Sequence, residues 1–184
     1  GLPGAYIFSH YKFWGKNLLK ALTTIPFVLP TVVVAASFQA ILGDNGWINN
    51  LLVYHLNLES PPILLKHTIW SILIAHVFYN TTIILRLVGD YWKIIDPKIF
   101  QASYMLGADK WTTFRTITLP ILTPAIISAT LLTFIFNFTS FGVILILGGP
   151  TFTNLEVAIY RQTINFFNLD LAALLSILQL IFTL

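Results

Sequence analysis

The stretch that decides the fold is TITLPILTPAIISATLLTFIFNFTSFGVILILGGPTFTNL, residues 116–155, a 40-residue run without a charged side chain. A helix needs about 20 apolar residues to cross the hydrocarbon core of a bilayer, so this run is too long for a single crossing. Gly148, Gly149 and Pro150 form a turn signal near its end. The run therefore predicts one membrane span over residues 121–147, followed by a loop.

Three other stretches have the length and composition of membrane spans. Residues 21–42 are 22 residues without a charge, and residues 67–85 are 19 residues without Asp, Glu, Lys or Arg. The chain is again apolar from Leu169 to its last residue. These stretches predict an all-α, polytopic transmembrane helical bundle that forms a single domain over residues 1–184, with further spans over residues 20–42, 66–88 and 169–184.

The composition excludes the other broad classes of protein. Only 9% of the 184 residues are charged and 57% are hydrophobic, whereas soluble domains have about 25% charged residues. Disordered chains are poor in aromatic residues, which make up 15% of this chain. The net charge of +3 rests on only ten basic residues, too few for a nucleic-acid footprint. We therefore expect a lipid membrane, and no nucleic acid, among the partners of this chain.

The ionisable residues give little sign of reactive chemistry. The chain contains no Cys, which excludes disulfides and thiolate metal sites. Its four His residues are scattered along the sequence, and no carboxylate lies well inside a predicted span. We therefore expect neither a metal site nor a catalytic residue in this chain.

The two ends of the sequence look like cut ends. The first residue is Gly, and no basic stretch leads into a short apolar core with a cleavage site, so we see no signal peptide. The last apolar stretch stops abruptly. These features lead us to expect an internal piece of a longer membrane protein, truncated at both ends.

The basic residues predict the orientation of the chain. Eight of the ten Lys and Arg residues lie in or beside two segments, and they are Lys12, Lys16, Lys20, Arg86, Lys93, Lys98, Lys110 and Arg115. The positive-inside rule places such segments in the cytoplasm. Residues 10–19 and 89–119 are therefore predicted to be cytoplasmic, and residues 43–65 and 148–168 to face outside.

The longer cytoplasmic segment, residues 89–119, reads GDYWKIIDPKIFQASYMLGADKWTTFRTITL. Asp96 followed by Pro97 is a favourable helix start, with an N-cap acceptor and proline at the first helical position. Gly107 can supply the left-handed conformation that ends this helix, and Asp109 can cap a second short helix. The pattern predicts a helix–glycine–helix unit that leads back to the membrane.

This segment carries more large apolar side chains than a plain connection needs. They are Ile95, Ile99, Phe100, Tyr104, Met105, Leu106, Trp111 and Phe114. An amphipathic helix that docks in a groove of a partner requires such residues. The alternative is that they pack on the neighbouring membrane helices or lie at the membrane interface, and periodicity alone leaves both interpretations open.

A longer motif runs through the same segment: Gln101-Ala102-Ser103, Leu106-Gly107-Ala108, Phe114, Ile117 and Leu119-Pro120. In spacing and in placement between two spans it resembles the EAA loop of ABC importer permeases. That family usually has Glu where Gln101 stands and Ala where Ser103 stands. The first departure removes a charge that could pair with an ATPase subunit, whereas the glycine and the Leu-Pro exit are retained.

The resemblance extends along nearly the whole chain. Residues 3–6, 25–34, 75–80, 147–150 and 155–160 are similar to permeases of the ferric-iron and thiamine importer group. The resemblance implies the type I ABC importer permease fold and a substrate such as ferric iron or thiamine. In that group two permease halves are often fused in one polypeptide, which implies that this chain is a fragment of one half.

The same resemblance implies a set of partners and a location. The partners are an ABC ATPase subunit, an extracytoplasmic solute-binding protein and a second permease half, fused or separate, in a prokaryotic plasma (inner) membrane. The chain has no G-x-x-x-x-G-K-[ST] loop, so ATP and Mg are expected on the ATPase, and this chain is expected to hold no cofactor and to be no enzyme. The residues implied in coupling to the ATPase are Gln101, Ala102, Ser103, Leu106, Gly107, Ala108, Phe114, Leu119 and Pro120.

Polar residues and prolines inside the spans are candidates for lining a translocation pathway. His76 and Asn80 are four residues apart and share one helix face, and Asn137 lies in the third span. Pro26 and Pro30 interrupt the backbone hydrogen bonds of the first span. Interhelical hydrogen bonds for the polar residues, and a purely structural kink for the prolines, are the open alternatives.

Two other functions compete with the importer interpretation. A membrane-embedded enzyme would need ionisable residues that converge on one site, and only His76 lies well inside a span. An ion-coupled secondary transporter is the stronger alternative, because Pro26 and Pro30 could mark a broken helix at a substrate site. The lack of acidic residues inside the spans weakens it.

Overall fold

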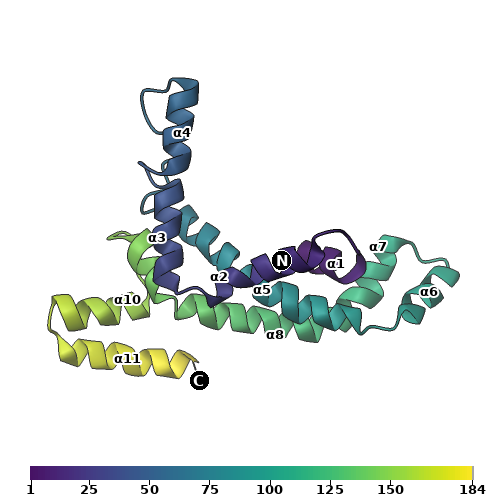
Figure 1. Ribbon diagram of the computed structural model, residues 1–184. Helices are drawn as coiled ribbons and strands as arrows, with labels where there is room; N and C mark the ends of the chain where they lie inside the picture. The colour runs from purple at the N-terminus through teal and green to yellow at the C-terminus, as the bar shows by residue number, and fades with distance from the viewer. Residues whose placement is uncertain (184) are drawn as a thin grey trace. The chain divides into compact units, whose positions relative to one another are not determined.

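The structure is a computed structural model that describes residues 1–183, in which every regular element is helical (Figure 1). The predicted all-α class is confirmed. The elements are α1 (Leu2–His10), α2 (Lys16–Val28), α3 (Thr31–Leu42), α4 (Trp47–Leu56), α5 (Ile69–Lys93), α6 (Pro97–Met105), α7 (Lys110–Thr113), η1 (Phe114–Thr118), α8 (Leu119–Phe138), α9 (Phe141–Val143), η2 (Ile144–Gly148), α10 (Leu155–Tyr160), η3 (Arg161–Asn165) and α11 (Leu169–Thr183), where η marks a π-helical segment.

The described chain divides into two compact units. Unit 1 contains residues 1–27 and 80–134, and unit 2 contains residues 28–79 and the described residues from 135 onward. Helices α5 and α8 contribute residues to both units, whereas the loop helices α6 and α7 belong to unit 1 alone. Each unit has a hydrophobic core of its own.

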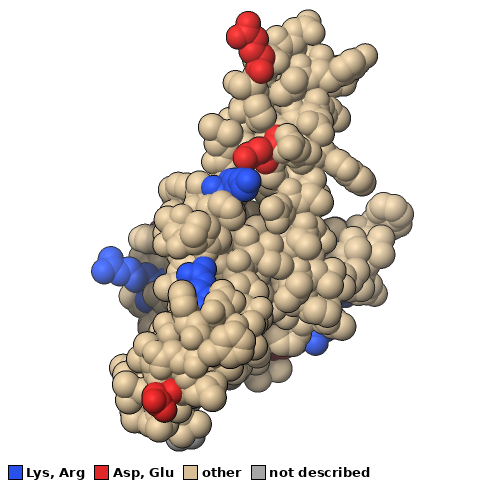
Figure 2. Space-filling view, turned by 90° about the vertical axis from the view of Figure 1, so that its left-hand side faces the viewer, with Lys and Arg blue, Asp and Glu red and all other residues tan. Residues whose placement is uncertain are grey.

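Two helices are long and apolar enough to cross a membrane. They are α5, with 25 residues, and the continuous helix Lys110–Phe138, with 29 residues, which joins α7, η1 and α8. The helix α2 meets this test only together with α3 and α4, and α11 is a shorter apolar helix. On the face shown in Figure 2, charged side chains are few, as expected for a protein with apolar helices of spanning length.

The span predicted over residues 20–42 is divided into two helices, α2 and α3. Pro30 has no N–H to donate, and it disfavours the helical conformation for the residue before it. Pro30 lies at the N-cap of α3, with ψ 136°. The Tyr79 hydroxyl donates a hydrogen bond to the Leu29 carbonyl oxygen over 3.3 Å, so the interruption has a partner from α5. Pro26, in contrast, is buried inside α2.

The helix expected over residues 121–147 ends early, at Phe138. The Asn154 side chain holds this interruption, since its Nδ2 donates to the carbonyl oxygens of Phe138 over 3.3 Å and of Ser140 over 3.1 Å. Its Oδ1 accepts a hydrogen bond from the Val157 N–H and so caps α10. One amide therefore supplies partners for the backbone groups that a broken helix leaves unpaired.

In unit 1, α1, α5 and α8 contribute to a common core. Its buried residues are Ala5, Ile83, Val88, Trp92, Ile95, Leu122 and Ala129. Polar contacts fix α2 on α5, because Arg86 donates to the Thr24 hydroxyl over 3.0 Å and Thr82 donates to the Thr23 carbonyl oxygen. The core thus packs α5, which precedes the predicted cytoplasmic loop, with α8, which follows it, and the polar contacts add α2 to α5.

In unit 2, the core joins α3, the first half of α5, α9, η2 and α10. Its buried residues are Ala35, Ile72, Ala75, Val143, Ile144, Leu147 and Val157. Gly142 allows the close approach of α9 to α3, since a Cβ at this position would lie 2.6 Å from Thr31 Oγ1 and 2.8 Å from Val32 N. Helices α10 and α11 form a hairpin, in which Gln179 Nε2 donates to Glu156 Oε1 over 2.5 Å.

Candidate functional site

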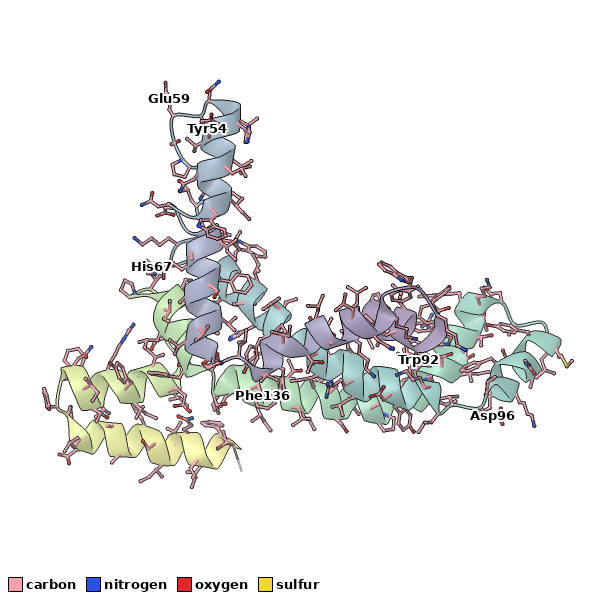
Figure 3. All side chains as sticks on the ribbon, viewed as in Figure 1. Tyr54, Glu59, His67, Trp92, Asp96 and Phe136 are labelled. Carbon is pink, nitrogen blue, oxygen red and sulfur yellow. The ribbon has the colours of Figure 1, made fainter. Side chains whose placement is uncertain are left out.

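The segment between α5 and α8 has the helix–glycine–helix structure that the sequence predicts. Asp96 lies at the start of α6 in Figure 3, where its side chain accepts a hydrogen bond from the Lys98 N–H over 2.9 Å, and Pro97 takes the first helical position. Asp109 caps α7 by accepting from the N–H groups of Trp111 and Thr112. Both predicted caps are confirmed.

Gly107 provides the reversal between the two helices, as predicted. Its φ is +84°, a left-handed conformation that costs an L-residue roughly 1–2 kcal/mol. The N–H of Ala108 donates to the Ser103 carbonyl oxygen over 3.1 Å, and the N–H of Gly107 donates to the Tyr104 carbonyl oxygen over 3.0 Å, which closes the end of α6. A Cβ at Gly107 would meet no atom within 4 Å, so this position requires glycine for its conformation and not for space.

A buried hydrogen bond connects the two helices of this loop. Ser103 Oγ of α6 lies 2.7 Å from Thr113 Oγ1 of α7, and the two residues are only 4% and 2% exposed. Ser103 is one of the two departures from the usual motif, and its role was missed in the sequence. Its partner Thr113 lies on the other side of the turn. The only signal in the sequence was that each of the two short helices contains a hydroxyl side chain that could form this hydrogen bond.

Some apolar residues of the loop pack on neighbouring helices and others are exposed, so each of the two interpretations of these residues holds for part of the set. Ile95 is buried in the core of unit 1, and Phe100 and Phe114 pack against that core. Met105, Leu106 and Trp111 are instead 90%, 88% and 67% exposed. The loop therefore has an inner side that packs on unit 1 and a largely exposed, outer apolar side, defined by Met105, Leu106 and Trp111.

The other residues of the motif follow the same division. Gln101 and Ala102 are exposed on α6, and Leu119 and Pro120 are exposed at the start of α8. Ala108 is half-buried next to the turn. Phe114 connects the two sides, because it packs against the core and its ring stacks on that of Trp111 with centroids 5.8 Å apart. The Trp111–Phe114 pair therefore joins the outer side to the core.

A cavity of about 570 Å³ lies beneath the loop, within unit 1. Its walls include the aromatic residues Tyr6, Trp92, Phe100, Tyr104, Trp111 and Phe114. Trp92, labelled in Figure 3, lies near the end of α5 and lines this cavity. The cavity therefore separates part of α6 and α7 from α1 and the start of α8.

Asp109 is the acidic residue of the loop whose pKa is shifted. Hydrogen bonds from the Thr112 side chain and backbone lower the pKa of the Asp109 carboxyl from its usual range. The carboxylate form is therefore the one that caps α7, and Lys98 and Lys110 are exposed on the same loop. Within residues 1–183, no three His, Asp or Glu side chains lie close enough together to hold a metal ion.

The candidate pathway residues lie on different elements. His76 Nε2 and Ser140 Oγ are 2.9 Å apart, so His76 makes the interhelical hydrogen bond that is the alternative to a pathway role. Asn80 is buried on α5, and Asn137 is half-buried on α8. Pro30 lies at the α2–α3 interruption. A pathway-lining role for His76, Asn80, Asn137, Pro26 and Pro30 stays a prediction.

Two apolar helices of spanning length identify a helical membrane protein. Residues 1–184 match the model of one such family, described as the inner membrane component of binding-protein-dependent transport systems. The chain belongs to this family, which confirms the resemblance to ABC importer permeases.

Individual relatives agree with this assignment. The chain is 32% identical over 186 residues to the thiamine transport system permease protein ThiP of Haemophilus influenzae, covering 100% of this chain and 34% of that protein. It is 30% identical over 160 residues to the probable sulfate transport system permease protein cysT of Chlorella vulgaris, covering 85% of this chain and 58% of that protein. The chain thus spans about one third to somewhat over half of the length of these relatives.

A solved structure shares the fold. It is the crystal structure of a bacterial ABC transporter involved in the import of the acidic polysaccharide alginate, with a TM-score of 0.75 and 17% sequence identity. The match covers 99% of this chain and 66% of that chain. The arrangement of helices in this chain is therefore that of a chain in an ABC importer.

Proposed function

We propose that the whole protein is the membrane permease subunit of an ATP-driven importer, and that this chain couples to a separate ATPase subunit through residues 89–119. The observation that carries the proposal is the capped helix–glycine–helix loop with its largely exposed outer side, Met105, Leu106 and Trp111. Membership of the family of binding-protein-dependent transport components supports it. A loop with this many exposed apolar residues matches a helix that docks in a groove.

The geometry suggests how the loop would act in this function. Gln101 and Ala102 are exposed in the middle of α6 and Leu106 is exposed at its C-cap, and the small Ala102 allows a close approach of a partner helix. The Ser103–Thr113 hydrogen bond makes α6 and α7 move together, and Phe114 connects them to the core. ATP-driven closure of the ATPase would then displace α8 through Leu119 and Pro120, which is a coupling between two sites through a two-state element.

The remaining partners follow from this function. ATP and Mg would be held by the ATPase subunit, and the loop would lie on the cytoplasmic side of a prokaryotic inner membrane. A solute-binding protein would dock on the outer side; one crystal structure of the alginate transporter contains a periplasmic protein with bound alginate pentasaccharide. A second permease half, fused or separate, would complete the translocation pathway.

Thiamine is the substrate to test first. Thiamine permeases of Haemophilus influenzae and Brucella suis match 100% and 97% of the chain at 32% identity, whereas the sulfate permease of Chlorella vulgaris matches 85% at 30%. The resemblance to the iron and thiamine group makes ferric iron the second candidate. The binding protein would select among such solutes.

The experiment is uptake by the full-length protein in proteoliposomes, together with its ATPase and binding protein. Thiamine, sulfate and ferric iron form parallel arms. We expect uptake of thiamine that requires both ATP and the binding protein. Uptake of any of the three that follows a proton or sodium gradient without ATP would contradict the importer function.

A further inference from the structure

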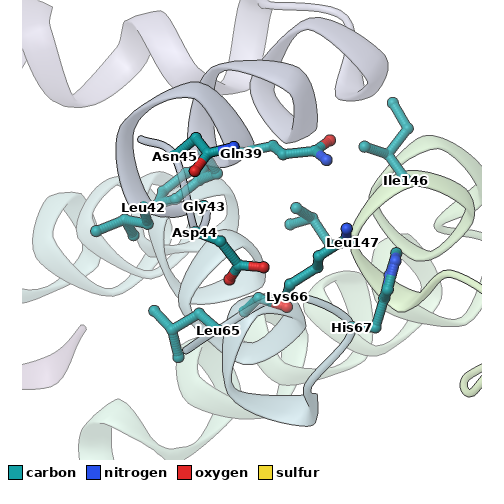
Figure 4. Close-up of a pocket in the computed structure, with 12 residues that line it drawn as sticks. Gln39, Leu42, Gly43, Asp44, Asn45, Leu65, Lys66, His67, Ile146 and Leu147 are labelled. Atoms are coloured by element: carbon teal, nitrogen blue, oxygen red, sulfur yellow. The ribbon is translucent and has the colours of Figure 1, made fainter. Parts of the chain in front are cut away.

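Two cavities of the structure differ in the charge of their lining. The smaller one, of about 220 Å³ and within unit 2, is lined by both the acid Asp44 and the base Lys66, together with His67 (Figure 4). The larger one is the cavity of about 570 Å³ beneath the loop in unit 1. Of the described residues that line it, Lys110 is the only one that is Lys, Arg, Asp or Glu. The larger cavity therefore favours an anion, whereas the mixed charge of the smaller one favours neither sign.

The larger cavity has a polar end at the loop and an apolar end beside the helices of unit 1. Lys110 lines the loop end, and Leu122 lies about 18 Å further along the same apolar helix, at 1.5 Å per residue. On α1, the His10 ring packs on Trp92 with centroids 5.4 Å apart, and Leu2 lies at the other end of the helix. The polarity of the lining therefore decreases with distance from the loop.

The walls of this cavity offer few free polar groups to water. The Thr113 hydroxyl lies 2.7 Å from Ser103 Oγ, and the Thr118 hydroxyl donates to the Thr113 carbonyl oxygen over 3.4 Å. Most of the other lining residues are aromatic or aliphatic. A buried water needs two to four polar partners, whereas a cavity of this size with apolar walls and few polar groups is typical of a ligand site.

Lys110 sets the charge of the ligand that would fit. Both ion pairs within residues 1–183 involve Asp90, so Lys110 has no carboxylate partner there. The preceding acid, Asp109, accepts hydrogen bonds from the N–H groups of Trp111 and Thr112 and does not line the cavity. An anionic group at the loop end would balance the Lys110 ammonium, while an apolar chain would fill the other end.

The cavity opens on the surface of unit 1 beside α1 and the start of α8. Leu2, Tyr6 and Leu119 line it and are 38%, 41% and 36% exposed. Leu119 belongs to a helix that is long and apolar enough to cross a membrane, so the molecules next to this opening would be lipids. Basic pockets between membrane helices on the cytoplasmic side bind anionic lipid headgroups.

We propose that this cavity binds an anionic phospholipid, with one acyl chain between α1 and α8 and the phosphate of the headgroup at Lys110. The inference goes beyond the proposed function, because the lipid would bind whether or not an ATPase docks on the outer side of the loop.

The test is equilibrium binding of radiolabelled dioctanoyl phosphatidylglycerol to the full-length protein in detergent, without an ATPase. We expect saturable binding of one lipid per chain. Dioctanoyl phosphatidylcholine, which has the same acyl chains but no net charge, should compete at least tenfold less well. Glycerol 3-phosphate, which has the anionic group but no acyl chain, should not compete.

Three variants separate the two ends of the site. Lys110→Gln should weaken the binding of phosphatidylglycerol at least tenfold and leave that of phosphatidylcholine unchanged. Leu2→Gln should weaken the binding of both lipids, because it places an amide at the apolar end. Lys98→Gln is the matched control, since Lys98 is exposed on α6 and does not line the cavity, and it should leave binding unchanged.

Three results would overturn the proposal. The first is an absence of saturable binding, which would mean that another part of the full-length protein fills the cavity. The second is equal affinity for the two lipids, and the third is an equal loss of affinity in Lys98→Gln and Lys110→Gln. An unchanged elution volume and helical circular dichroism of each variant would show that a loss of binding is not a loss of fold.

Discussion

At the scale of residues, the Ser103–Thr113 hydrogen bond joins α6 to α7 in the loop between α5 and α8. We expect Ser103→Ala to loosen α6 on α7, because it leaves the buried Thr113 hydroxyl without its partner at a cost of about 1–3 kcal/mol. Thr113→Val should have a similar effect. Because the two residues share one interaction, the effects of the single changes should not add in the double variant.

Hydrogen exchange of the α6 and α7 amides in the full-length protein measures this coupling. Ser128→Ala is the matched control, since the Ser128 hydroxyl is exposed and bonds to the Pro124 carbonyl oxygen of its own helix. It should leave exchange in the loop unchanged. Strictly additive effects of the two single changes would show that the Ser103–Thr113 contact contributes no coupling.

Asp109 makes the cap of α7 sensitive to acid. Its pKa is lowered in the folded protein, so its contribution to stability is present above the unfolded pKa of about 3.9 and is lost as the pH falls through the folded value. We expect the protection of the Trp111 and Thr112 amides to decrease on acidification in this range. Asp109→Asn should remove that pH dependence, whereas Asp96→Asn, at the other cap, should retain it.

At the scale of elements, Asn154 has two separable roles at the interruption after α8. Its Nδ2 pairs the Phe138 and Ser140 carbonyl oxygens, and its Oδ1 caps α10 at Val157. Asn154→Asp keeps the cap acceptor but removes the donor, and should destabilise unit 2 by about 1–3 kcal/mol. Asn154→Ala loses both roles and should be less stable still. Thermal unfolding in detergent ranks the variants, and a stability of Asn154→Asp equal to that of the wild-type protein would refute the donor role.

Local features of the loop could be predicted from the sequence, because their causes lie within a few residues. The Asp96-Pro97 start, the Gly107 reversal and the Asp109 cap all depend on neighbouring backbone groups. The interruption at Phe138 could not be predicted, since a charge-free run is compatible with one helix, and its partner Asn154 approaches from another element.

In the candidate site, too, the features that depend on distant parts of the chain could not be predicted from the sequence. Exposure of Met105 and Leu106 and burial of Ile95 are set by neighbouring helices, and periodicity alone could not separate them. His76 was identified as a polar residue inside a span, but its partner Ser140 lies 64 residues away in the sequence, just beyond the end of α8. The cavity lined by residues 38–45, 65–71 and 146–147 brings together segments that are far apart in sequence and carry no motif.

At the scale of the whole molecule, the distribution of basic residues predicts that residues 89–119 are cytoplasmic and residues 43–65 are outside. The sequence contains no Cys, so single-cysteine variants report one position each. In intact cells, an impermeant thiol reagent should label Glu59→Cys and not Lys98→Cys, two exposed positions. After permeabilisation both should react. Labelling of Lys98→Cys in intact cells would overturn the orientation.

The central claim is that the helix–glycine–helix loop docks an ATPase, and recovery of that ATPase with the full-length protein tests it most directly. Gly107 and Gly15 offer a matched pair, with φ of +84° and +80° and open space around each. Gly107→Asp should reduce recovery of the ATPase about tenfold or more. The substitution strains the turn by roughly 1–2 kcal/mol and also places a negative charge on the docking side. Gly15→Asp, with the same strain and charge outside the loop, should leave recovery intact, and Gly107→Asn should retain most of it. Full recovery with Gly107→Asp, or no ATPase with the wild-type protein, would contradict the account.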